Sequence, residues 1–336
     1  AIHPCCRNFL KNVKNYNPQY KHDYERKMIN SVQGYIKRLI EFVNPELCFI
    51  AIDGVAPAAK MSQQRLRRFK TVLEKEQHQK LQKEIYGNDN QTGWDTNAIS
   101  PGTEFMDKLK NSIISYIKSK EFDDVDIVFS SANVYGEGEH KIFEFIRETP
   151  LEGNIVIYGL DADLIMLSMA ANKDDIYLLR ESVEYNKVDM DRLLYMDIEE
   201  LKHHIKIDIK SKYFEIESKF YDTTLEEGFI NDYIFLCFLL GNDFIPHSLT
   251  LDLRHKGIEN IINFYLHGFY NFKKNLVSPT GKVDEDFFRF IIKKISESED
   301  HIVSNLRKTR ERMRPRAGDY TNSDPRDNEY QRRLDV

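Results

Sequence analysis

The chain has 336 residues, 41% of them hydrophobic and 30% charged, which excludes a disordered chain and fits one large α/β domain or one domain with part of another. The net charge of −6 does not mark the whole chain as a nucleic-acid binder, so local basic patches carry more information than the total. Four cysteines without CxxC spacing imply neither a zinc knuckle nor a disulfide framework, and no segment reaches the ~20 apolar residues of a membrane helix.

The patterned segments then alternate between strand and helix. Apolar runs predict strands at 47–53, 124–131, 154–160 and 175–180, and the intervening segments 60–85, 105–119, 140–148 and 161–170 read as helices. The apolar run 234–240 fits a buried core helix. This alternation predicts a mostly parallel, doubly wound sheet flanked by helices, followed beyond 250 by a helical extension.

Six carboxylates lie where the predicted strands or the apolar helix end, or beside glycines. They are Asp53, Glu137, Glu139, Asp161, Asp163 and Asp243. Taken singly, each also fits a structural role, such as a helix cap or a first-turn acid. In doubly wound sheets, however, function gathers at the carboxyl ends of strands. Two metal ions that hydrolyse a phosphodiester need such converging oxygen ligands, so the set predicts a metal site.

The predicted helix 60–85 is locally basic, with eight Lys/Arg against three Glu. At about 100° per residue, Lys60 and Arg67 differ by about 20° around the helix, and Gln64 and Arg68 lie about 40° and 80° from Lys60. Such a face suits phosphate, because Arg binds it through two bonds and Lys offers a point charge. A solvated charged face is the alternative, although the start of the run near Asp53 favours function. Arg65 is a weaker candidate.

Over roughly its first 250 residues the chain resembles the XRN family of 5′→3′ exoribonucleases, through the ordered segments AIDGVAPAAKMSQQRLRRFK, WDTNAISPGTEFM, YGEGEHKI, GLDADLIML and LGNDFIPH. The resemblance implies a PIN/flap-nuclease-like fold and a two-metal nuclease, using Mg²⁺ or Mn²⁺, that degrades single-stranded RNA with a 5′ monophosphate. It assigns the six acids to the metals and Lys60, Gln64, Arg67 and Arg68 to the 5′ phosphate. It also places His3 against the first base.

The resemblance further predicts how the chain is divided. We expect a nuclease domain over 1–250, the helical start of a second conserved region over 251–306, and a basic, disordered tail over 307–336, where nine Lys/Arg accompany almost no apolar residues. The start AIHPCC lacks an initiator Met and a signal peptide, so we expect a fragment. In the family, the first Asp that binds metal lies a few residues before the stacking His. If the chain is a fragment, that Asp lies before Ala1.

Two further differences from the family bear on the interpretation. Ala58 stands where relatives usually carry Arg, and Trp94 belongs to the WDTN motif rather than to the family's second stacking site, so processivity is not implied. The segment 181–213 has no Cys, unlike the zinc knuckle of the nuclear branch, and its His203 and His204 read as exposed helix residues. We therefore expect a cytoplasmic-type or viral relative.

Two other functions are the alternatives to an exonuclease. A flap endonuclease would carry a Gly-rich DNA-binding hairpin after Asp243, where this chain has a lone Gly257. A catalytically impaired RNA-binding protein would have lost acids that are present here. We expect a monomer that acts on RNA, with decapping or decay factors as partners and no membrane.

Overall fold

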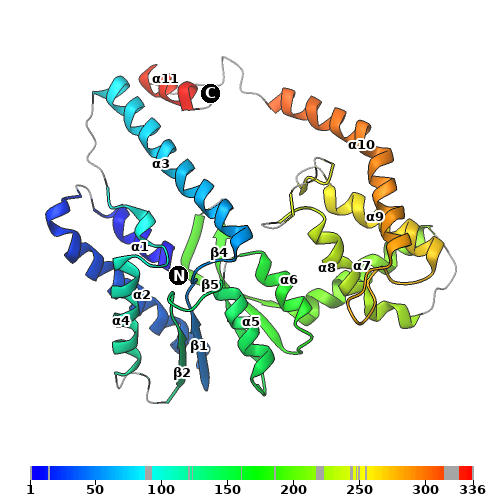
Figure 1. Cartoon of the computed structure of the whole chain (residues 1–336), viewed down its shortest axis with the longest axis horizontal. Coiled ribbons are helices and arrows are strands. Elements are labelled where there is room, and N and C mark those ends of the chain that lie inside the picture. The colour runs from blue at the N-terminus through cyan, green and yellow to red at the C-terminus, as the bar shows by residue number, and fades with distance from the viewer. Residues whose placement is uncertain are drawn as a thin grey trace. The chain divides into compact units, whose positions relative to one another are not determined.

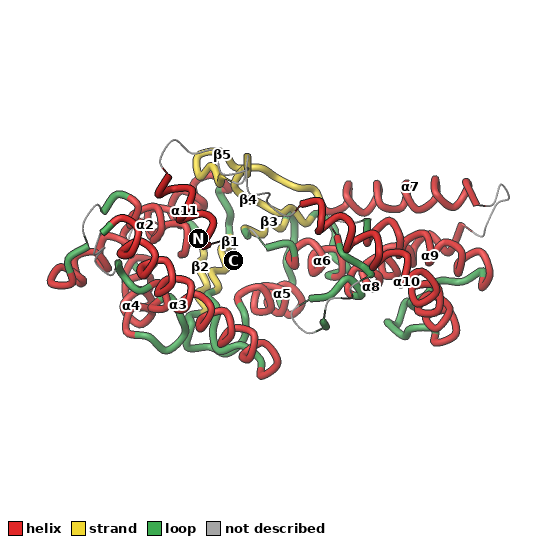
Figure 2. The backbone as a smooth tube through the Cα atoms, turned by 90° about the horizontal axis from the view of Figure 1, so that it is seen from above, coloured by secondary structure: helices red, strands yellow, loops and turns green. Residues whose placement is uncertain are grey.

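The computed structural model describes residues 2–13, 16–87, 93–119, 122, 124–159, 161–184, 187–216, 223–242, 245–246, 248, 250–253, 256–313 and 325–334. The chain forms two compact units, the first comprising Ala1–Pro150 with Arg316–Val336 and the second Leu151–Pro315. Helix is the main element of both units, and none of the helices in the described residues is long and apolar enough to cross a membrane (Figures 1 and 2).

The first unit is a two-stranded parallel sheet covered by helices on both faces (Figure 1). Its elements are α1 (Ile2–Lys11), α2 (Lys21–Val43), β1 (Leu47–Ala51), α3 (Ala58–Tyr86), α4 (Glu104–Ile117), β2 (Asp126–Ser130), α5 (Gly138–Glu148) and α11 (Pro325–Leu334). The ring of Phe49 in β1 stacks on Phe145 of α5 with centroids 4.4 Å apart, and α4 brings Ile114 and Ile117 beside Phe129 of β2.

The ends of these helices follow local chemistry. Asn44 ends α2 in the left-handed conformation with its N–H on the carbonyl of Ile40, and Gly87 ends α3 in the same way. Thr103 begins α4 by accepting the N–H of Met106, as expected of an N-cap residue. The predicted helices 60–85 and 105–119 are therefore confirmed within a few residues by α3 and α4.

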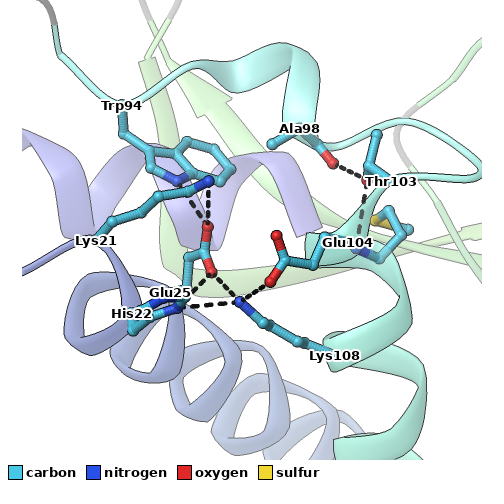
Figure 3. A network of polar contacts seen from close by, with 9 residues as sticks. Lys21, His22, Glu25, Trp94, Ala98, Thr103, Glu104 and Lys108 are labelled. Atoms are coloured by element: carbon cyan, nitrogen blue, oxygen red, sulfur yellow. Dashed lines mark hydrogen bonds and ion pairs between the residues drawn. The ribbon is translucent and has the colours of Figure 1, made fainter. Parts of the chain in front are cut away.

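A buried carboxylate fixes the segment that leads into α4 (Figure 3). Glu25 of α2 is 2% exposed and accepts a hydrogen bond from the indole N–H of Trp94 at 3.4 Å and from Lys108 Nζ at 2.9 Å. Lys108 also pairs with Glu104 at 2.8 Å. The WDTN segment is thus held to α2 by a charged hydrogen-bond network, which removal of the carboxylate would leave unsatisfied.

The second unit combines a mixed three-stranded sheet with a helical core. Its elements are β3 (Ile155–Tyr158), α6 (Asp163–Ala170), β4 (Ile176–Glu184), β5 (Lys187–Asp197), α7 (Ile198–Ile216), α8 (Phe229–Phe238), α9 (Gly257–Phe272) and α10 (Glu285–Met313). The strand order is β3-β4-β5, parallel between β3 and β4 and antiparallel between β4 and β5. Sequence patterning missed β5. The apolar core lies among α7, α8, α9 and α10, as predicted for the run 234–240.

The fold is therefore mixed α/β with parallel strand pairing, as expected, although the described strands form two separate sheets rather than one doubly wound sheet. The structure's two units divide after Pro150, and the division of the chain expected at 250 and 306 stays a prediction.

The C-terminal segment is more ordered than the sequence predicted. Helix α11 packs on the far half of α3, where Tyr86 donates a 2.5 Å hydrogen bond to Asp327 and Arg333 pairs with Glu84 at 3.0 Å. Tyr330 is 7% exposed and bonds the ring of His78. The expectation of disorder over 307–336 fails for 307–313 and 325–334, because a short polar helix gains its stability from tertiary packing rather than from its own apolar content.

Candidate active site

The end of β1 and the glycine-rich acidic loop after β2 are bonded to each other. Asp53 follows β1, and its Oδ1 accepts the N–H of Gly138, the first residue of α5, at 2.6 Å. Gly54 donates to the carbonyl of Gly136 at 2.8 Å, and Gly136 donates to that of Val55 at 2.9 Å. A Cβ at Gly138 would lie 3.1 Å from Asp53 Oδ1, so the glycine allows this close approach.

Lys141 forms hydrogen bonds to the residues that follow β1 and β2. Its side chain is buried in α5, and Nζ donates to the carbonyls of Ile52 at 2.8 Å and Ser131 at 3.0 Å. Burial lowers the pKa of this amine, while the charge of Asp53 opposes the shift. Because Ile52 and Ser131 follow β1 and β2, the lysine fixes the position of Asp53 relative to the loop.

Three side chains of the acidic loop come together as candidate metal ligands. One ligand atom each from Glu137, Glu139 and His140 lies within 4.8 Å of the others, and Glu137 is buried. Lys60 Nζ lies 2.7 and 2.8 Å from the two carboxylate oxygens of Glu137. The structure thus brings the first turn of α3 onto the acidic loop. The sequence did not predict this contact, because it placed the basic run close to Asp53 alone.

His140 is the residue that sequence reasoning missed. Its Nε2 lies 3.8 Å from Glu137 Oε2, and half of its side chain is exposed. The available signal was its place in the GEGEH motif, three residues after Glu137 and so on the same side of a helix beginning there.

The remaining predicted phosphate ligands follow Lys60 along α3. Gln64 is half-buried, whereas Arg67 and Arg68 are exposed. Only Leu81 is buried among the residues of α3, and apart from Lys60 this helix presents its basic side chains to solvent rather than to the core. The assignment of these residues to a 5′ phosphate stays a prediction.

His3 lies exposed in α1. The protein atoms around its ring lower its pKa through lost hydration, Arg7 lowers it further, and Asp53 acts in the opposite direction. The assignment of His3 to the first base stays a prediction.

Two of the predicted acids belong to the second unit. Asp161 and Asp163 follow β3, both are exposed, and Asp163 is the first residue of α6. Before these acids, Gly159 packs closely against Leu164: a Cβ added to the glycine would lie 2.1 Å from the Cδ1 atom of this leucine. Asp243 lies outside the described residues. The convergence of all six acids therefore stays a prediction.

The donor set of the first unit fits a divalent metal ion. Carboxylate oxygens are the ligands preferred by Mg²⁺ and Mn²⁺, and an added imidazole is compatible with Mn²⁺. The buried Glu137, the flanking glycines and a lysine at the start of a basic helix give a site that can hold a cation beside an anion.

Comparison with known proteins identifies matches along most of the chain. Residues 1–182 match the family model described as XRN 5'-3' exonuclease N-terminus, and residues 224–334 match the Xrn1 helical domain. A Schizosaccharomyces pombe protein named 5'-3' exoribonuclease 2 is 33% identical over 84% of this chain and 34% of its own length. Proteins of the same name from Emericella nidulans and Candida albicans are 33% and 30% identical, over 85% and 90% of this chain and 33% and 35% of their lengths. The chain spans about a third of these relatives.

Proposed function

Because this chain belongs to the XRN family of 5′→3′ exonucleases, we propose that it degrades RNA bearing a 5′ monophosphate and releases mononucleotides from that end. The observation that carries this proposal is the contact between Lys60 at the start of the basic helix and Glu137 in the acidic loop. A cation site and an anion site therefore meet within one unit, as hydrolysis next to a 5′ phosphate requires.

Each residue has a role in this proposal. Lys60, Gln64, Arg67 and Arg68 bind the 5′ phosphate through charged hydrogen bonds. Capped and triphosphate ends are rejected because they are too bulky for a pocket that holds one phosphate. His3 stacks on the first base, a contact that tolerates any sequence and contributes roughly 1–3 kcal/mol.

The metal ligands in this proposal are the acids singled out in the sequence. They are Asp53, Glu137, Glu139, Asp161, Asp163 and Asp243, with His140 added by the structure. A pair of Mg²⁺ or Mn²⁺ ions supplies an activated water and charge stabilisation of the leaving oxygen. Lys141 keeps the strand ends and Asp53 in place. The placement of Asp53 and of Asp161 at the carboxyl ends of strands supports a doubly wound, PIN-like nuclease fold, because function gathers at such strand ends.

The proposed setting is RNA decay in the cytoplasm, supported by the absence of Cys from 181–213, where a zinc knuckle would mark the nuclear branch. Decapping or decay factors are the proposed partners, because they generate 5′ monophosphate ends.

The test compares RNAs that differ only in a 5′ monophosphate, hydroxyl or triphosphate, with Mg²⁺ and with EDTA. We expect Mg²⁺-dependent loss of the monophosphate RNA at a rate at least tenfold above the other two. Equal degradation of all three ends would exclude the phosphate pocket.

A matched pair of variants tests the metal ligands. Asp161→Ala should lower the rate about 10²-fold or more, in the range found when a group that stabilises the transition state is removed. The control Asp208→Ala removes an exposed acid of α7, paired with Lys212 at 2.6 Å, and should leave the rate unchanged. RNA binding without degradation by the unmodified chain would instead support the catalytically impaired RNA-binding protein.

A further inference from the structure

The contact between Lys60 and Glu137 is a two-oxygen ion pair shielded from water. Lys60 Nζ lies 2.7 Å from one carboxylate oxygen and 2.8 Å from the other, and the two side chains are only 12% and 8% exposed. Exposed pairs contribute little because water and salt screen them, whereas low exposure and charged hydrogen bonds strengthen this one. The pair therefore holds the ammonium firmly on the acidic loop.

The two partners belong to different halves of the proposed site. Glu137 lies in the acidic loop with Glu139 and His140, the candidate metal ligands. Lys60 lies in the first turn of α3, on the side of the helix that continues through Gln64 to Arg67. Lys60, from the half proposed to bind the anionic phosphate, is thus bonded to Glu137, from the half proposed to bind the metal cation.

A divalent cation on Glu137 uses the same carboxylate oxygens as the Lys60 ammonium. The repulsion between the two cations is twice that of two unit charges at the same separation, and it acts where little water screens it. Lys60 then has to leave the carboxylate. Its flexible stem and three N–H donors allow it to take another anion within reach, and the face shared with Arg67 is where the 5′ phosphate is proposed to bind.

We propose that Lys60 makes metal binding and 5′-phosphate binding interdependent, because each ligand takes one partner of the Lys60–Glu137 pair and frees the other. A cation on Glu137 releases Lys60 for the phosphate, and a phosphate on Lys60 releases Glu137 for the cation. This inference rests on the proposed function. Since linkage is reciprocal, the factor by which the cation tightens phosphate binding equals the factor by which phosphate tightens cation binding.

Calorimetric titration with adenosine 5′-monophosphate tests the coupling without catalysis, because this probe has no phosphodiester bond to hydrolyse. The unmodified chain should bind it at least 5-fold more tightly in saturating Mn²⁺ than in EDTA, within the usual 5–150-fold range of coupling. In Lys60→Met the ratio of the probe's affinity in Mn²⁺ to its affinity in EDTA should fall to about 1. Mn²⁺ alone should bind to this variant more tightly than to the unmodified chain. Adenosine should show no dependence on Mn²⁺.

Lys70→Met is the matched control, since it removes a lysine from the same helix that is 77% exposed and pairs only loosely with Glu74, at 3.6 Å. It should keep the ratio of the unmodified chain. Association of Mn²⁺ with the nucleotide in solution is the same for both variants, so the difference between them reports the protein alone. An unchanged ratio in Lys60→Met would refute the coupling.

Glu137→Gln provides a second measurement if Lys60→Met does not fold. A neutral amide holds the ammonium less firmly, so the probe should bind more tightly in EDTA than it does to the unmodified chain, and Mn²⁺ should no longer change its affinity. The control Glu74→Gln removes an exposed carboxylate from α3 and should change neither value. If the unmodified chain binds Mn²⁺ and the probe independently, the coupling is refuted and the proposed function stands. Failure to bind either ligand would refute both.

Discussion

Gly54 is the position at which a single added carbon should do most harm to the candidate site. It follows Asp53, and its N–H bonds the carbonyl of Gly136 in the acidic loop at 2.8 Å. A Cβ there would lie 1.7 Å from the carbonyl oxygen of Val134 and 3.2 Å from that of Ala132. Real Cβ contacts essentially never fall under 3.0 Å, and both obstacles are backbone, so Gly54→Ala must push the two segments apart by more than an ångström.

The expected cost follows from what that displacement breaks. The hydrogen bonds of Gly54 with Gly136 and of Gly136 with Val55 hold the segments together, and each contributes roughly 1 kcal/mol net. Including the residual strain, Gly54→Ala should lower the free energy of unfolding of the first unit by about 2–4 kcal/mol. Asp53 moves with its neighbour, and a misplacement of about 1 Å in a catalytic group can reduce the rate about 10²-fold.

The assay pairs this variant with Gly34→Ala. Gly34 is exposed within α2, and nothing lies within 4 Å of the position of its added Cβ. Alanine there should stabilise the helix by about 0.5–1 kcal/mol, so the same chemical change has the opposite sign at the two positions. Urea unfolding followed by Trp94 fluorescence measures both, because the chain's single tryptophan is buried in the first unit. Equal stability and equal RNA degradation in the two variants would refute the reasoning.

Two further predictions concern buried carboxylates. Asp232 accepts four hydrogen bonds in the core of the second unit, including one from the N–H of Val277 at 2.7 Å. Asp232→Asn should therefore lower the free energy of unfolding of this unit, measured by hydrogen exchange, by roughly 1–3 kcal/mol. The exposed control Asp208→Asn should lower it by about 0.5 kcal/mol or less. Burial raises the pKa of Asp232 above 3.8, so its contribution to stability is present below pH 3.8 and is lost as pH rises through the raised pKa, a dependence that Asn should abolish. Glu25→Gln should lower the unfolding free energy of the first unit by roughly 1–3 kcal/mol and change the fluorescence of Trp94, whereas little or no change in either would contradict the network.

The sequence predicted the elements that carry a strong local pattern. The strands β1 to β4 and the helices α3 and α4 were found because apolar runs and amphipathic spacing are local properties. The placement of Asp53 after β1 and of Asp161 after β3 followed from the same pattern.

The features that the sequence did not predict depend on contacts between distant segments. Lysine is a residue type that is mostly exposed, yet Lys141 is buried because two carbonyls at strand ends accept its N–H groups. The packing of α11 on α3 joins Tyr330 to His78, which lie 252 residues apart, and no local periodicity encodes such a contact. The pairing of Lys60 with Glu137 was likewise invisible, since both were assigned to ligands rather than to each other.

The long helix α3 is supported at its two ends and scarcely between them. Its 29 residues span roughly 44 Å at 1.5 Å per residue, with Lys60 tied to Glu137 at the beginning and Tyr86 tied to Asp327 at the end. Arg67 and Arg68 stand seven and eight residues beyond Lys60, which is roughly 10–12 Å along the axis. As long as the helix is intact, these arginines keep a nearly constant spacing from the residue that is bonded to the acidic loop.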